Sequence, residues 1–173
     1  MRVLKDRASS REFAARPLPP QVLSSLLWAA FGINRPESGR RTAPSAVNWQ
    51  ETDVYVVLPD GAYLYDAKAN SLQPVAAGDL RGLAGTQDFV GRAPLNLVYV
   101  ADFARMGNAS PESKVFNSAA DTGFIAQNVY LFCASEGLAT VVRGSIDKTK
   151  LAQALKLRPD QRITLAQTVG YPK

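Results

Sequence analysis

The chain has 173 residues, a formal net charge of +5, no histidine and one cysteine, Cys133. This length fits a single domain, 1–173, and one cysteine excludes an internal disulfide or a thiolate cluster for a metal. Without histidine, catalysis would need carboxylates, hydroxyls or a borrowed cofactor. The basic residues are scattered, and no apolar run approaches the ~20 residues of a membrane helix. We therefore expect neither nucleic acid nor a membrane as a partner.

The first half of the chain predicts one helix, an irregular segment and three strands. Apolar residues recur at helical spacing over 18–32. Residues 33–50 are rich in Pro, Gly, Ser and Asn, which is typical of a functional or mobile loop. Residues 53–67 predict a β-hairpin around a Pro-Asp-Gly turn, and 95–103 predict a central strand that is apolar on both faces.

The second half begins with a long helix over 115–136 that is apolar on more than one side. Such a helix must be buried on several sides, and a second subunit could cover one of them. Cys133 lies within it and is expected in the core rather than as a reactive thiol. A strand over 138–146, a helix over 148–157 and a last strand over 162–172 follow. This order predicts an α+β fold with a mixed sheet, and no dinucleotide or P-loop motif is present.

Three stretches could carry chemistry, and the first is KDRASSREF, residues 5–13. If a helix ends near Ala8 and an extended segment follows, Arg7, Ser9 and Arg11 can converge. Two guanidinium groups and a hydroxyl would then form a phosphate receptor. The alternative is an N-terminal helix whose arginines are solvated and whose serines serve as a cap.

The second stretch, RRTAPSAVNWQ, places amides and hydroxyls in a loop where they could hydrogen-bond a heterocycle. Loops rich in turn residues carry such side chains by default, so this signal alone is weak. The third stretch is GLATVVRGS, in which a strand ends at Arg143-Gly144. Because Gly144 has no Cβ, its backbone could approach a flat ligand. The alternative there is a simple strand end with a surface arginine.

Taken in order, RASSREF, APSAVNWQ, the long helix, GLATVVRG and VGYP resemble the nitroreductase family of flavin enzymes. The resemblance spans essentially the whole chain and is closest to short members grouped with SagB-type dehydrogenases. It implies an α-β-α sandwich with a mixed, mainly antiparallel sheet and a long buried central helix. It also implies a homodimer that binds FMN at the subunit interface.

The same resemblance implies roles for individual positions of this chain. Arg7 and Ser9 match residues that hold the FMN phosphate and ribityl chain, and Arg11 matches a basic position at the flavin N1/O2 edge. A loop matches the segment that reaches the flavin of the partner subunit, and the end of a strand matches the segment whose backbone amides approach N5 and O4. The residues so implied as cofactor-binding are Arg7, Ala8, Ser9, Arg11, Pro44, Ser45, Asn48, Val142, Arg143, Gly144 and Lys173.

Two departures from the family pattern concern the loop and the C-terminus. The family commonly follows the loop glutamine with Pro-Trp, whereas here Glu51-Thr52 follow Gln50. Many members also continue past GYP to a basic tail that touches the phosphate, whereas this sequence ends at Lys173. Lys173 is the candidate substitute.

The resemblance implies an FMN-dependent oxidoreductase, and such chemistry needs no protein acid or base at the reacting atom. We expect a ping-pong cycle in which NAD(P)H reduces FMN and a quinone or nitroaromatic acceptor then takes the electrons. Arg11 would stabilise negative charge because it cannot deprotonate. One alternative is a SagB-type dehydrogenase that oxidises an azoline-like substrate, and another is a non-enzymatic basic module that binds an anionic partner. The cytoplasm is the default compartment, with the periplasm as the alternative if a leader preceded Met1.

Overall fold

The computed structural model describes residues 1–173 as four α-helices, eight strands and three 3₁₀ turns. In chain order they are α1 (Arg2–Asp6), α2 (Pro20–Phe31), β1 (Ile33–Arg35), β2 (Arg40–Arg41), η1 (Ala46–Asn48), β3 (Thr52–Leu58), β4 (Gly61–Asp66), β5 (Ser71–Ala77), η2 (Arg81–Ala84), β6 (Leu95–Asp102), η3 (Phe103–Met106), α3 (Pro111–Glu136), β7 (Ala139–Arg143), α4 (Lys148–Ala154) and β8 (Gln161–Gly170).

Six strands form one sheet in the order β5-β4-β3-β6-β8-β7, and β1 pairs separately with β2. Every neighbouring pair in the six-stranded sheet is antiparallel. The strands β6 and β7 run in the same direction, but β8 lies between them and pairs with both. The sheet therefore contains no parallel pair, whereas a mixed, mainly antiparallel sheet was expected.

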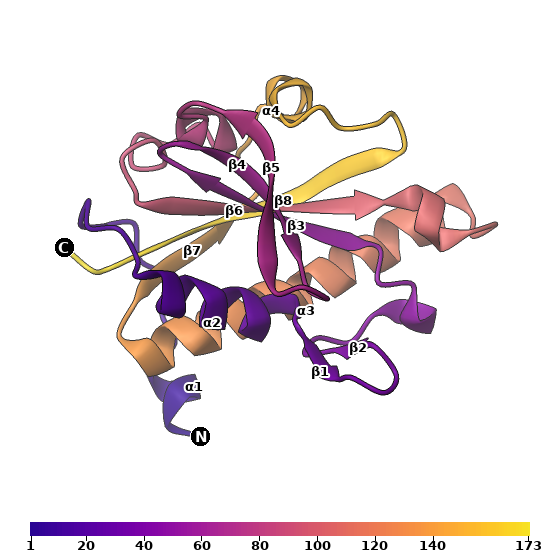
Figure 1. The fold of residues 1–173 in the computed structure, drawn as a ribbon, viewed down its shortest axis with the longest axis horizontal. Helices are drawn as coiled ribbons and strands as arrows, with labels where there is room; N and C mark the ends of the chain where they lie inside the picture. Colours follow the sequence, from indigo (N-terminus) through magenta and orange to yellow (C-terminus); the bar gives the residue numbers. More distant parts are fainter.

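The fold has three layers, with α2 and α3 against one face of the sheet and α4 over the other (Figure 1). The core beneath α2 and α3 contains Leu26, Phe31, Leu97, Ile125 and Val129 among its buried side chains. The core beneath α4 contains Val57, Val98, Leu151 and Leu155. This arrangement confirms the α-β-α sandwich with a long central helix.

The helix α3 begins earlier than predicted because a cap precedes it. Ser110 Oγ accepts a hydrogen bond from the backbone N–H of Ser113 at 3.2 Å, and Pro111 occupies the first turn. The helix ends at Gly137, whose φ of 66° lies in the left-handed region that glycine tolerates. Cys133 is 1% exposed, and burial raises the pKa of its thiol to about 12. The cysteine therefore belongs to the core, as expected.

Large apolar side chains remain exposed along the outer side of α3. Phe116 is 73% exposed and Phe124 is 48% exposed, whereas Ile125 and Val129 are fully buried against the sheet. This outer side is where the sequence favoured a second subunit, and that contact stays a prediction. No helix combines the length and apolar character that a membrane crossing requires.

Candidate functional site

The N-terminal segment changes from helix to extended chain within the first predicted stretch. The helix α1 ends at Asp6, and Arg7 has extended angles of φ −60° and ψ 118°. The backbone N–H of Ser10 donates to the carbonyl of Thr140 at 3.0 Å, which holds the segment beside β7. Side chains alternate along an extended chain, so an extended course from Arg7 onward would place Arg7, Ser9 and Arg11 on one side. The helix ends before Arg7, and the convergence of the three side chains stays a prediction.

Tyr130 of α3 fixes this segment, and the sequence analysis did not single it out. Its hydroxyl lies 2.8 Å from Ser9 Oγ and accepts a hydrogen bond from the backbone N–H of Val142 at 3.0 Å. The guanidinium of Arg7 lies over its ring, 5.3 Å from the centroid. Tyr130 is only 7% exposed. A buried tyrosine hydroxyl needs a partner, so a tyrosine inside an apolar helix was the available signal.

Ala8 and Lys173 lie on either side of this cluster. Ala8 and Tyr130 line a small hollow of about 170 Å³ that Pro172 also borders. Phe13 pairs with Pro172 in an isolated antiparallel bridge, which places the exposed Lys173 near the N-terminal segment. The C-terminus therefore lies beside the extended segment around Phe13, whereas Met1 lies away from it below α1 (Figure 1).

At the end of β7 the side chain of Arg143 is buried, whereas the next residue, Gly144, is exposed. The N–H of Val142 is already used by Tyr130, whereas Gly144 is exposed. The Arg143 side chain is 7% exposed and points into the molecule. Of this segment, Gly144 therefore presents an accessible backbone, and Arg143 does not act as a surface cation.

The buried guanidinium of Arg143 has no carboxylate partner. Its Nη1 donates to the carbonyl of Ala84, and its Nη2 donates to Asn96 Oδ1 at 2.6 Å and Thr168 Oγ1 at 2.7 Å. Burial lowers its pKa to about 10. A Cβ on Gly85 would overlap this guanidinium, so Gly85 is required where the two segments meet. These contacts tie the 84–86 loop to the end of β7.

A second pair of contacts joins the same two segments closer to the surface. Thr86 Oγ1 lies 2.6 Å from Ser145 Oγ, and the N–H of Thr86 donates to the carbonyl of Ser145 at 3.0 Å. The backbone on both sides of Gly144 is thus held in place, by the contacts of Arg143 before it and of Ser145 after it. Such anchoring preorganises the backbone that the resemblance assigns to N5 and O4.

The loop over 44–50 is held in an unusual conformation. Val47, Asn48 and Gln50 have φ values of 53°, 59° and 48°, in the left-handed region that non-glycine residues rarely adopt. Ser45 Oγ accepts from the N–H of Gln50 at 2.8 Å and donates to Glu51 Oε2 at 3.2 Å. The Ser45 hydroxyl is therefore committed within the loop.

Two buried carboxyl groups lie under this loop. Glu51 is fully buried, and Asp121 of α3 is 3% exposed and accepts from the N–H of Ala46 at 2.9 Å. Burial is the main cause that raises the pKa of Glu51, and the charge of Asp121 adds to it. Glu51, at which this chain departs from the family pattern, thus helps to hold the loop in place through its hydrogen bond with Ser45.

Within one chain the structure does not bring the loop and the N-terminal segment together. The loop is attached to α3 at Asp121, nine residues before Tyr130. At 1.5 Å per residue this is roughly 13 Å along the helix. The loop and the N-terminal segment therefore contact α3 at separate points, and a site completed by a second chain stays a prediction.

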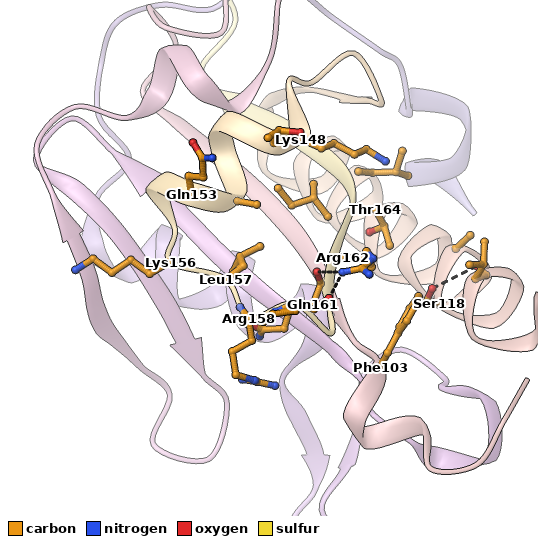
Figure 2. A pocket seen from close by; sticks show the side chains of 17 residues that line it. Phe103, Ser118, Lys148, Gln153, Lys156, Leu157, Arg158, Gln161, Arg162 and Thr164 are labelled. Carbon is orange, nitrogen blue, oxygen red and sulfur yellow. Dashed lines mark hydrogen bonds between the residues drawn. The ribbon is translucent and has the colours of Figure 1, made fainter. Parts of the chain in front are cut away.

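The largest cavity lies apart from both the loop and the N-terminal segment. It measures about 960 Å³ and runs between α4, the first half of α3 and the part of β8 that has no β7 neighbour. Figure 2 shows Phe103, Ser118 and Arg162 on one side of it and Gln153 on the other. None of the predicted cofactor residues lines it. Its nearest approach to them is Leu165, which lies next to Gly144.

The chain thus has an α+β fold of three layers. Comparison with known proteins identifies the family of this chain. The model of the Nitroreductase family matches residues 4–171, and the chain belongs to this family.

Three relatives show how close the likeness is. A candidate nitroreductase of Methanocaldococcus jannaschii is 31% identical over 166 residues, which are 90% of this chain and 83% of that protein. The crystal structure of a candidate nitroreductase from Ralstonia eutropha JMP134 superposes with a TM-score of 0.96 at 47% identity, over 100% of this chain and 82% of that one. The NADPH:FMN oxidoreductase of Vibrio harveyi, solved with NAD+, has a TM-score of 0.71 at 21% identity, over 99% of this chain and 67% of that one.

Proposed function

We propose that this member of the nitroreductase family is an FMN-dependent oxidoreductase that uses NAD(P)H to reduce quinone or nitroaromatic acceptors in a ping-pong cycle. The observation that carries the proposal is that Arg7 and Ser9 contact Tyr130, whose hydroxyl also binds the N–H of Val142, two residues before the exposed Gly144. Membership of the family supports the oxidoreductase class. The name of the Vibrio harveyi protein supports FMN and a nicotinamide donor.

The residues present fit FMN by charge and by shape. The phosphate would be held by Arg7 and Ser9, with Lys173 as a further cation on the same side. Arg11 would face the N1/O2 edge and supply a positive charge there. No carboxylate forms an ion pair with Arg7 or Arg11, so both charges remain available to an anion.

The backbone of Arg143 and Gly144 would face the N5 and O4 edge. Since the N–H of Val142 is bonded to Tyr130, the role of Val142 is to position this segment rather than to donate to the cofactor. FMN, when bound, supplies the two-electron chemistry, which explains how a chain without histidine can be an oxidoreductase.

The proposed active unit is a homodimer. The exposed Phe116 and Phe124 on α3 provide an apolar face for a second chain. We infer that the loop bearing Pro44, Ser45 and Asn48 completes the site of the partner chain, because it is attached to α3 at Asp121 and not near Tyr130.

The test is to mix the FMN-loaded protein with NADPH or NADH in the absence of oxygen and follow the flavin absorbance. Bleaching by either nucleotide, followed by recovery on adding a quinone, is the expected result. Failure of both nucleotides, with bleaching by an azoline-containing substrate, would instead support the SagB-type dehydrogenase. A protein that neither carries nor binds FMN would contradict both, and would leave the non-enzymatic anion-binding module.

A further inference from the structure

The β1–β2 hairpin and the loop after it enclose a second hollow, of about 550 Å³. Its lining comes entirely from residues 35–48 and includes Arg35, Arg40 and Arg41. No acidic residue lines it, and none of the three arginines forms an ion pair. Three cationic side chains that line one hollow without an acidic lining residue favour an anion there.

Two of the three guanidinium groups are already held in place by neutral acceptors. Arg35 Nη2 donates to the carbonyl of Arg41 at 2.6 Å, and its Nε donates to Asn34 Oδ1 at 3.1 Å. Arg41 donates to Gln50 Oε1 at 2.8 Å and to the carbonyl of Phe31 at 2.9 Å. Side chains fixed in this way lose less conformational entropy when a ligand binds.

Arg40 differs from its two neighbours because its side chain makes no hydrogen bond and is exposed. The nearest acidic groups to Arg41 are Asp53 and Asp66, and these line a separate hollow on its other side. The arginine hollow thus has two fixed cations and one free cation. An arginine can bind a phosphate through two parallel hydrogen bonds, so the hollow suits a phosphate group.

The position of the hollow suggests which phosphate it takes. Pro44, Ser45 and Asn48, the loop proposed to reach the flavin of the partner chain, form its other wall. A ligand seated there would lie beside the proposed cofactor site, while Arg7 and Ser9 serve the FMN phosphate elsewhere. Resting on the proposed function, we propose that this hollow binds a phosphate of the nicotinamide dinucleotide donor, and that it favours NADPH.

The experiment uses Arg40→Gln, with Arg92→Gln as the matched control, because Arg92 is also exposed and unpaired but lies away from the hollow. Binding of 2′,5′-ADP to the FMN-loaded dimer is measured by calorimetry, and KM and kcat are measured with NADPH and with NADH. We expect Arg40→Gln to weaken 2′,5′-ADP binding and raise the NADPH KM by about tenfold, as for one charged hydrogen bond. The kcat and the FMN affinity should not change.

The nucleotide pair identifies the phosphate that is bound. An effect on NADPH alone assigns the hollow to the 2′-phosphate and supports the proposal. An equal effect on NADH would assign it to the pyrophosphate and overturn the preference for NADPH. Unchanged 2′,5′-ADP binding and unchanged KM values in Arg40→Gln would overturn the proposed site. A loss of FMN affinity in Arg40→Gln would also overturn the proposal, because it would show that the hollow binds the flavin phosphate. If 2′,5′-ADP binds through Arg40 but no FMN binds, the site stands and the proposed function fails.

Discussion

Arg143 and Arg40 carry the same charge in opposite surroundings. Arg143 is 7% exposed, and three neutral acceptors surround its guanidinium. Arg40 is exposed, and no acceptor in the chain reaches it. The first joins the 84–86 loop to β7 and is part of the structure, whereas the second faces an open hollow without acidic residues. Arg143, whose two terminal nitrogens are bonded within the fold although its buried Nε has no partner, supports a site, whereas Arg40 has no bonding partner and is available to a ligand.

The largest expected effect comes from the buried cation. Arg143→Met removes the donors to Ala84, Asn96 and Thr168 and leaves the carbonyl of Ala84 without this partner, while Asn96 Oδ1 keeps its hydrogen bond from Thr168. We expect the free energy of unfolding to fall by about 3 kcal/mol. Urea denaturation measures it, with Arg40→Gln as the control that should stay within about 0.5 kcal/mol of the wild type. Equal stability of the two variants would remove the distinction between these arginines.

The next effect concerns cofactor affinity. Arg7→Ala removes one charged hydrogen-bond donor from the proposed phosphate site, and it should weaken FMN binding by about 1.5–3 kcal/mol. Quenching of flavin fluorescence during titration gives the dissociation constant. Arg2→Ala is the matched control, because Arg2 lies on α1 and is exposed. An unchanged dissociation constant for Arg7→Ala would rule out its role at the phosphate.

A smaller effect is expected from the hydroxyl of Tyr130. Tyr130→Phe keeps the ring beneath Arg7 but removes the link between Ser9 and the N–H of Val142. The free energy of FMN binding should weaken by about 1 kcal/mol, because the N-terminal segment and the end of β7 lose the hydrogen bonds that join them through Tyr130. The same titration measures it, and an affinity equal to that of the wild type would show that the link does not position the site.

The smallest effect is a change in how stability depends on pH. Burial and Asp121 raise the pKa of Glu51 in the folded chain, so its contribution to stability is present at low pH and is lost as the pH rises through the raised pKa. Glu51→Gln should therefore lose less stability than the wild type as the pH rises above the ordinary range of a glutamate. Asp53, whose pKa burial also raises, is present in both proteins and cancels in the comparison. Parallel pH profiles of unfolding free energy would contradict this role.

Much of the fold could be predicted because the signals are local. The hairpin of β3 and β4 follows from alternating β-formers around Pro59-Asp60-Gly61, and α2 follows from its helical periodicity. The strand β5 was not predicted, since Pro74 interrupts its pattern. The structure tolerates this proline because β5 is the edge of the sheet.

The candidate site was predictable only in part, because its support comes from distant segments. The spacing of Arg7, Ser9 and Arg11 allowed convergence, but the choice depended on Tyr130, which lies more than a hundred residues later. Arg143 at a strand end suggested a surface cation, yet the 84–86 loop covers it through a contact that only Gly85 permits. No local pattern reveals such packing.

Amide hydrogen exchange with and without FMN tests the central claim most directly, namely that the cofactor lies between the N-terminal row and the end of β7. The account predicts strong protection on FMN binding in the peptides that cover 7–11 and 142–145, and protection of 44–48 from the second chain. Saturable FMN binding that protects instead the cavity between α4 and β8, and leaves 7–11 unchanged, would contradict it.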